Sequence, residues 1–337
     1  MKLAVVVVSY NTRDLLDRCL AATLASAKAS SLDDSQFQIV VVDNASVDGS
    51  AEMTAQRYPQ VRLIASDSNL GFTGGNNLAL ALLGFSVALP AGVERPALAQ
   101  PDTRPDYVLL LNSDAEPVGD ALGRMTNFLE ANPAAGICGP RLQYGDGRFQ
   151  HSAFYYPDLF QTALGFFSLS RIRGAHRIHD SRLNGRYPAR LWQSETPFRV
   201  DFVLGAAMMA RGAAIDQVGG LDNDYYMYCE EIDWCMRMDD AGWDVYAVPA
   251  ALVTHHAGQS SKKVRWQAYV RLWRSRLLLT AKHPQRYPSG YLHLMRGLIR
   301  FGSWWNMAGA RRRFARGEIT GAELAVELAA HAEVMRL

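Results

Sequence analysis

The sequence predicts an α/β fold, because segments with the hydrophobic pattern of buried strands alternate with segments of helical pattern along the first third of the chain. The first strand is predicted over residues 3–8, which are all apolar and mostly valine, as expected of a strand covered on both faces. Further strands are predicted over residues 37–42, 61–65 and 107–111. Strands that alternate with helices favour parallel pairing through crossovers, so we expect a mostly parallel sheet flanked by helices.

The predicted helices have recognisable ends. Thr12 is expected to cap the first helix, and the Asn132-Pro133 pair ends a helix over residues 120–131. A later helix over residues 230–241 ends at Gly242, which adopts the left-handed conformation at little cost. Two further helices are predicted over residues 50–58 and 74–83.

The composition indicates a globular protein with an ample core, since 49% of the 337 residues are hydrophobic. The four cysteines show no CxxC spacing, which suits a reducing compartment and argues against a cysteine zinc site. No signal peptide and no apolar run near the ~20 residues of a membrane span is evident. We therefore expect a cytoplasmic location.

The charge is unevenly distributed. Residues 262–317 contain 14 Lys and Arg and no Asp or Glu, whereas residues 1–261 carry 20 basic and 29 acidic residues. This predicts one domain over residues 1–261 and a basic, mainly helical region over residues 262–337. Residues 145–200 show no clear period.

Polar residues follow the predicted strands at the edge where open parallel sheets bind ligands. Asp43 after the second strand could bind the ribose or base of a nucleotide. The alternative is that Asp43 belongs to a turn that caps the next helix. No GxGxxG follows the first strand, so a dinucleotide is not expected. Gly71, Gly74 and Gly75 allow close approach of a ligand and open a helix whose N-terminus favours anions.

Asp114 follows a very apolar strand, where a carboxylate is costly without a partner. A divalent cation would supply that partner, and the alternative is a helix cap before Pro117. His255 and His256 follow an apolar run, and they suggest a metal site only beside a carboxylate such as Asp114.

The acidic cluster Glu230, Glu231 and Asp233 lies among aromatic residues. Crowded carboxylates with aromatic neighbours have raised pKa values, which suits a general base. The alternative is a solvated helix start that complements the helix dipole.

Together these segments resemble the family-2 glycosyltransferases with the GT-A fold, especially the rhamnosyltransferase-like branch. The similarity extends over roughly residues 3–280. It implies a GT-A catalytic domain over residues 1–261, with a nucleotide-binding half, residues 1–118, and an acceptor half, residues 119–261. The matching segments are VVVVSYN (5–11), VVVDNASVDGS (40–50), NLGFTGGNN (69–77), LLLNSDA (109–115), GAAMMARG (205–212), GGLDNDYYMYCEEIDWCMRMDDAGW (219–243) and HHAGQSS (255–261).

The resemblance implies a role for each matching residue. Asp43 would bind the base, and Asp114, the last residue of a DxD-type motif that here reads Asn-Ser-Asp, would bind Mg²⁺ or Mn²⁺. His255 would complete the metal site, with His256 as a less favoured substitute. The other residues expected around the donor are Ser9, Asn11, Asn69, Gly71, Gly74, Asn76 and Asn112.

The family's catalytic base is usually the Asp of a Glu-Asp-x-Asp segment, which here reads Glu-Glu-Ile-Asp. Glu231 takes that place with a side chain one methylene longer, so Asp233 remains an alternative. A second departure is Asn223, where an acidic residue is usual, and it weakens inference about the acceptor.

The resemblance implies an inverting glycosyltransferase. The sugar, with rhamnose favoured by analogy, would pass from a dTDP- or UDP-linked donor to a hydroxyl of a glycan or lipid-linked acceptor in cell-surface polysaccharide synthesis. One alternative is a nucleotidyltransferase, which needs a glycine-rich, basic phosphate loop that does not follow the first strand. Another is a sugar-nucleotide-binding protein without turnover.

A basic amphipathic helix is predicted over residues 291–305, capped by Ser289. His293, Arg296, Arg300 and Ser303 form one stripe of it, and Trp304-Trp305 and three arginines follow. This pattern suits an anionic membrane surface, which would place the protein peripherally on the inner face of the cell membrane. The alternative is a helix packed on the catalytic domain; nucleic acid is not expected as a partner. Thr320 and Glu323 form a capping-box pattern that predicts a final helix.

Overall fold

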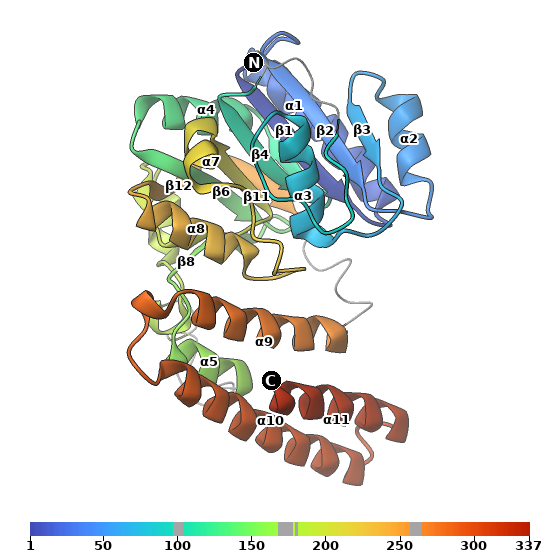
Figure 1. Ribbon diagram of the computed structural model, residues 1–337, viewed down its shortest axis with the longest axis vertical. Coiled ribbons are helices and arrows are strands. Elements are labelled where there is room, and N and C mark those ends of the chain that lie inside the picture. The colour runs from blue at the N-terminus through green and yellow to red at the C-terminus, as the bar shows by residue number, and fades with distance from the viewer. Residues whose placement is uncertain (97–103, 168–177, 179–180, 257–264) are drawn as a thin grey trace. The chain divides into compact units, whose positions relative to one another are not determined.

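The computed structural model describes residues 1–96, 104–167, 178, 181–256 and 265–337, and the chain divides into two compact units (Figure 1). The first unit comprises residues 1–155, 187–226 and 230–259, and the second comprises 156–186, 227–229 and 260–337. Residues 156–186 and 227–229 thus group with the C-terminal region. The domain boundaries expected from the sequence, 1–261 and 262–337, stay a prediction.

The first unit is built on a mixed sheet with strand order β3-β2-β1-β4-β11-β6-β12-β5. The four strands predicted from the sequence are β3, β2, β1 and β4, and they pair in parallel as expected. Beyond β4 the sheet becomes mixed, because β11 is antiparallel to both β4 and β6, and β12 is antiparallel to β5. The strands are β1 Leu3–Ser9, β2 Phe37–Asp43, β3 Arg62–Ala65, β4 Tyr107–Asn112, β5 Ala115–Val118, β6 Ala135–Gln143, β7 Phe149–Gln150, β9 Phe198–Arg199, β11 Ala207–Arg211 and β12 Asp244–His255, with β8 Ala153–Phe154 and β10 Phe202–Val203 as a separate pair.

Helices cover both faces of this sheet. One core joins Leu3, Val5 and Val7 of β1 with α1 and α4. On the other face α3 packs on β1 and β2 (Figure 1), where a Cβ added at Gly75 would lie 2.8 Å from Val8 Cγ1. The helices of this unit are α1 Arg13–Ala29, α2 Ser50–Arg57, α3 Gly71–Leu82, α4 Ala121–Ala131, the short 3₁₀ helix η3 Ala189–Gln193, α7 Gly212–Val218 and α8 Glu230–Asp240.

Two details at helix ends differ from expectation. Thr12 occupies the cap position of α1, but its side chain caps no helix N–H and instead bonds to Ser9 (3.0 Å) and Ser113 (2.9 Å). Helix α3 begins at Gly71, three residues earlier than predicted, because Gly71 takes a positive φ of 72° and turns the chain into the helix. Gly242 after α8 has a φ of 88°, as predicted.

The second unit is helical. Its core joins Phe166, Trp273, Met295, Ile299 and Val334. The described elements are α5 Leu159–Phe166, η2 Arg182–Asn184, α9 Arg265–Lys282, η5 Pro284–Arg286, α10 Tyr291–Ala315 and α11 Gly321–Arg336.

The ends and faces of α10 and α11 test the expectations for this region. The capping box of Thr320 and Glu323 is present at the start of α11. The prediction that Ser289 caps α10 is wrong, because Gly290, with a φ of 80°, holds the cap position. Ser303 is fully buried, so it does not belong to an exposed basic stripe. In the part of the chain that the structure describes, no helix is long and apolar enough to cross a membrane.

Two glycines of α10 provide a matched test of this packing. A Cβ at Gly302 would overlap the ring of Phe166, whereas one at Gly309 meets nothing within 4 Å. Gly302→Ala is expected to lower the free energy of unfolding of the second unit, because overpacking typically costs about 1–3 kcal/mol. Gly309→Ala is expected to raise it by up to about 1 kcal/mol through helix propensity. Thermal and urea unfolding measure both, and a stabilised Gly302→Ala protein would contradict the packing.

Candidate functional site

The carboxyl ends of three neighbouring strands lie at one edge of the sheet. In the parallel register Ser9 of β1 pairs with Asp43 of β2, and Val8 pairs with Asn112 of β4. Thr12 links this edge further, since its hydroxyl bonds to both Ser9 and Ser113. The strand-end residues singled out in the sequence are therefore neighbours in space.

Asp43 is 2% exposed and has two different carboxylate oxygens. Oδ2 accepts a hydrogen bond from the backbone N–H of Ser46 at 2.9 Å. Oδ1 is buried and has no hydrogen-bond partner among the described residues. A buried carboxylate oxygen without a donor is costly, so Oδ1 is suited to accept an N–H or O–H from a ligand.

Asn11 ties the two loops beside Asp43 together. Its backbone, held at a positive φ of 53°, donates to Ser46 Oγ at 2.9 Å, and its Oδ1 accepts from the N–H of Val47 at 2.9 Å. Asn11 thus shapes the loop next to Asp43 through its own hydrogen bonds.

The glycine-rich segment is held against this edge by internal bonds. Asn44 Nδ2 donates to the Gly71 carbonyl at 2.9 Å, and Asn69 Oδ1 accepts from the Gly71 N–H at 2.9 Å. Asn76 donates to the Phe72 carbonyl at 2.9 Å. A Cβ at Gly74 would lie 2.8 Å from Pro90 Cγ.

Gly71 also lies close to the backbone of another segment. A Cβ at Gly71 would lie 2.6 Å from the Tyr226 carbonyl, so the glycine brings this segment against the aromatic stretch that precedes α8. The glycines therefore serve packing within the protein, in addition to any contact with a ligand.

Asp114 and His255 meet although they are far apart in the chain. Strand β12 pairs antiparallel with β5, which places His255 opposite Ala115, and the N–H of His256 donates to the Asp114 carbonyl at 2.9 Å. His255 Nε2 lies 3.3 Å from Asp114 Oδ1, and both side chains are mostly buried. On the other side of the ring, His255 Nδ1 lies 3.1–3.2 Å from the side-chain amide of Gln150.

This donor set fits a divalent cation. A carboxylate and an imidazole converge on one point, and a polar side chain holds the second ring nitrogen, as is usual for metal-ligating histidines. Among the residues outside the gaps named above, no three His, Cys, Asp or Glu side chains cluster as a complete metal site. Mg²⁺-type sites commonly use one or two carboxylates and take further ligands from substrate phosphates and water, so two protein ligands are adequate.

The neighbouring His256 faces a different acid. Its Nε2 lies 2.8 Å from Glu116 Oε1, which also lies 3.3 Å from Arg18 Nε. Of the two histidines, His255 lies beside Asp114 and His256 beside Glu116. The rest of the HHAGQSS segment, residues 257–261, lies outside the described residues.

Glu230 and Glu231 begin α8 and differ in surroundings. Burial, and then the adjacent Glu231, raise the pKa of Glu230 well above its ordinary value, as the crowded sequence predicted for this cluster. Glu231 lies beside the glycine-rich segment, since a Cβ at Gly205 would lie 3.6 Å from Glu231 Cβ and 3.7 Å from the Phe72 ring.

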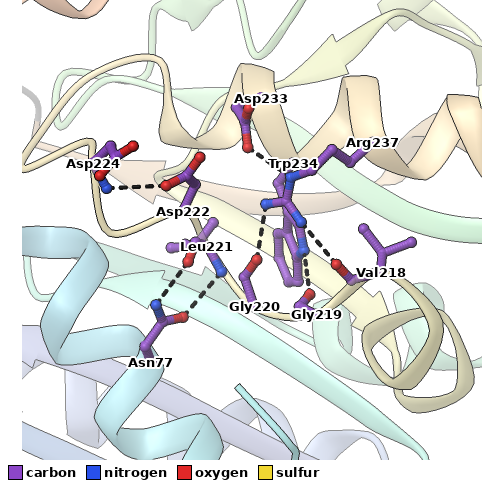
Figure 2. Close-up of polar contacts among 10 residues, drawn as sticks. All are labelled: Asn77, Val218, Gly219, Gly220, Leu221, Asp222, Asp224, Asp233, Trp234 and Arg237. Carbon is purple, nitrogen blue, oxygen red and sulfur yellow. Dashed lines mark hydrogen bonds and ion pairs between the residues drawn. The ribbon is translucent and has the colours of Figure 1, made fainter. Parts of the chain in front are cut away.

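Asp233 is bound to an arginine (Figure 2). Its Oδ2 lies 2.7 Å from Arg237 Nε, and the rest of that guanidinium donates to the carbonyls of Val218 and Gly220. Asp233 is 1% exposed, so this ion pair anchors α8 to the loop before it.

The loop that contains Gly219, Gly220 and Leu221 is held from two sides (Figure 2). Trp234 Nε1 of α8 donates to the Gly219 carbonyl at 2.9 Å, and Asn77 of α3 exchanges two hydrogen bonds with the backbone of Leu221. Asn77 also donates to Asn223 Oδ1 at 3.0 Å, so the asparagine that departs from the family pattern is part of this anchor.

The described residues connect these groups along one edge. The Asn112 N–H donates to the Ala206 carbonyl at 2.9 Å, and Ala206 follows Gly205, the neighbour of Glu231. Gln150 and Arg237 were not singled out in the sequence. Gln150 falls in a stretch without a clear period, and the i, i+4 spacing of Asp233 and Arg237 was the one signal available for the arginine.

Comparison with known proteins identifies the family of the chain. Residues 2–274 match the family model described as glycosyltransferase-like family 2. The chain is 31% identical over 260 residues, 77% of each chain, to an N-acetylglucosaminyl-diphospho-decaprenol L-rhamnosyltransferase of Mycobacterium tuberculosis. It is 27% identical over 269 residues to the rhamnosyltransferase WbbL of Escherichia coli, covering 78% of this chain and 88% of that one.

Solved structures support the fold. A mannosyltransferase from Pyrobaculum calidifontis, solved with GDP-Man and Mn²⁺, superposes with a TM-score of 0.54 at 16% identity, over 99% of this chain and 85% of that one. GalNAc-T7, solved with UDP, GalNAc and Mn²⁺, gives a TM-score of 0.51 at 12% identity, over 94% of this chain and 58% of that one. The GT-A-like fold expected from the sequence is confirmed. Because the family model matches residues 2–274, most of this chain, the chain belongs to glycosyltransferase family 2 and is a glycosyltransferase.

Proposed function

We propose that the protein transfers rhamnose, with inversion at the anomeric carbon, from a dTDP- or UDP-linked donor to a hydroxyl of a glycan or lipid-linked acceptor in cell-surface polysaccharide synthesis. The relatives named as rhamnosyltransferases support the sugar, and the decaprenol-linked substrate in one of their names supports the class of acceptor. The family argues against a nucleotidyltransferase.

One observation carries the proposal. Asp43, the Asp114–His255 pair and Glu231 come from distant parts of the chain, and short contacts through Asn44, Gly71, Gly205 and Ala206 connect them along the carboxyl edge of one sheet. That edge is where open α/β sheets bind their ligands.

Each group has a distinct task in this proposal. The buried Oδ1 of Asp43 accepts an N–H of the nucleotide base. Asp114 and His255 would hold Mg²⁺ or Mn²⁺, with Gln150 orienting the imidazole. The bound cation would supply charge neutralisation at the diphosphate.

Glu231 is the proposed base. In a single displacement, the acceptor oxygen forms a bond to the anomeric carbon while the bond from that carbon to the diphosphate oxygen breaks. The acceptor proton passes to the Glu231 carboxylate, and the nucleoside diphosphate leaves with the bonding electron pair. Asp233 is less suited because Arg237 already binds its carboxylate.

The two candidate bases predict different variant phenotypes. Glu231→Gln should keep donor affinity and melting temperature but lose about 10²–10⁴-fold in kcat, the usual worth of general base catalysis. Asp233→Asn should lower the melting temperature, because it breaks a buried ion pair, yet keep turnover per folded molecule. The turnover of both variants is measured by the release of nucleoside diphosphate from dTDP-rhamnose, with UDP-galactose, UDP-glucose and GDP-mannose as comparison donors. Near-normal turnover of Glu231→Gln, with turnover lost in folded Asp233→Asn, would transfer the base role to Asp233.

The metal assignment has its own test. Removal of divalent cations with EDTA should abolish transfer, and added Mn²⁺ should restore it, because the diphosphate loses its counter-charge. Asp114→Ala and His255→Ala should weaken Mn²⁺-dependent donor binding, measured by calorimetry. His256→Ala is the matched control, since His256 faces Glu116, and it should bind the donor normally. Undiminished transfer in EDTA, or equal loss of donor binding in all three variants, would refute the assignment.

A further inference from the structure

Helix α10 carries apolar side chains on two different sides, which at about 100° per residue lie roughly 110° apart around the helix axis. Met295, Ile299 and Gly302 face the core of the second unit, where α10 packs against α5, α9 and α11 (Figure 1). On the other side, large apolar side chains are about half exposed or more, namely Leu294 (63%), Phe301 (53%), Trp304 (53%) and Trp305 (47%). A helix with a single apolar face would account for the first set alone, so the second set calls for an explanation.

The exposed apolar residues form a continuous stripe. Leu294, Phe301 and Trp305 are seven and four residues apart, which at about 3.6 residues per turn keeps them on one line along the helix. Trp304 flanks that line, and its ring stacks on Phe301 with centroids 5.8 Å apart. We call Leu294, Phe301, Trp304 and Trp305 the α10 stripe.

Basic residues border the α10 stripe. His293, Arg300 and Arg311 are spaced by seven and eleven residues, so they form a parallel row, and Arg312 continues the stripe itself at the C-terminal end. His293, Arg300, Arg311 and Arg312 are all exposed. No Asp or Glu occurs between residues 262 and 317, so the sequence of this region supplies no acidic side chain to balance the row.

From this arrangement we propose that the α10 stripe and its basic row form a docking surface for an anionic phospholipid bilayer, with α10 lying in the plane of the interface. Tryptophan is enriched in the headgroup region because its ring is large and partly polar, and phenylalanine and leucine add apolar area on the buried face of interfacial helices. Arginines beside them pair with lipid phosphates, which explains why the row carries one sign of charge. The surface goes beyond the proposed chemistry, and it would bring the enzyme to an acceptor embedded in a membrane.

The stripe can be tested on the full chain with vesicles. Wild-type protein should float with vesicles of phosphatidylcholine and phosphatidylglycerol. The triple variant Phe301→Ser, Trp304→Ser, Trp305→Ser should lower the fraction bound by at least about tenfold, because three large apolar side chains lose their burial. Val326→Ser is the matched control. Val326 is similarly exposed on α11 but faces a groove lined by Trp266 of α9, so its loss should leave flotation unchanged.

The basic row is tested separately. Arg311→Glu with Arg312→Glu should abolish the preference for vesicles that contain phosphatidylglycerol over pure phosphatidylcholine, because the surface potential then repels the helix. Arg62→Glu with Arg190→Glu makes the same change in net charge on the first unit and should keep that preference. Since both pairs reverse the same charge, a difference between them reports on location.

Defined outcomes would overturn the proposal. The first is that wild-type protein does not float with anionic vesicles. The second is that the triple variant and Val326→Ser lose flotation equally. The third is that wild-type protein is a dimer in solution and the triple variant is a monomer. The last result would assign the surface to a second copy of the chain. If the triple variant unfolds, as judged by circular dichroism, Trp304→Ser alone decides the point.

Docking and chemistry are distinguished by a water-soluble acceptor analogue. The triple variant should transfer sugar to that analogue at the wild-type rate, because the α10 stripe contains none of the residues proposed for catalysis. If wild-type protein floats but transfers no sugar, the docking surface stands and the proposed reaction fails.

Discussion

The antiparallel pairing of β12 with β5 is the interaction on which the arrangement of the site depends. It sets His255 opposite Ala115 and joins the His256 N–H to the Asp114 carbonyl. Because side chains alternate along a strand, a slip of one residue would move His255 away from its place beside Asp114. Buried side chains on β12 make such a slip costly, so the register that builds the core also selects the metal-facing histidine.

A second constraint divides the acidic cluster at the start of α8. Residues two apart on a helix point about 200° away from each other, so Glu231 and Asp233 cannot serve the same surface. Asp233 is bound by Arg237, which together with Trp234 and Asn77 holds the loop of residues 219–221. Glu231 instead lies beside Gly205, which also neighbours Phe72. One short acidic sequence thus supplies both a structural anchor and a candidate base.

In the second unit, helix α10 likewise has two roles. One face completes a helical core with Phe166 and Trp273, and a second face leaves aromatic rings exposed beside a row of basic residues. Helical periodicity located the helix, but the predicted polar stripe included Ser303, which is fully buried. The direction of the core could be decided only by the neighbours α5, α9 and α11.

Sequence patterns were enough to predict the parallel strands β3-β2-β1-β4, the helices between them and the residues at the strand ends, because strand and helix patterns are local and strongly periodic. Local signals could not supply β6, the choice of His255 over His256 near Asp114, or the positions of Gln150 and Arg237. Each of these depends on register or on a contact between residues distant in the chain. Thr12 shows the difference most clearly. Its position at the start of α1 could be predicted from the sequence, but its hydroxyl bonds to Ser113, a partner that only the folded sheet brings within reach.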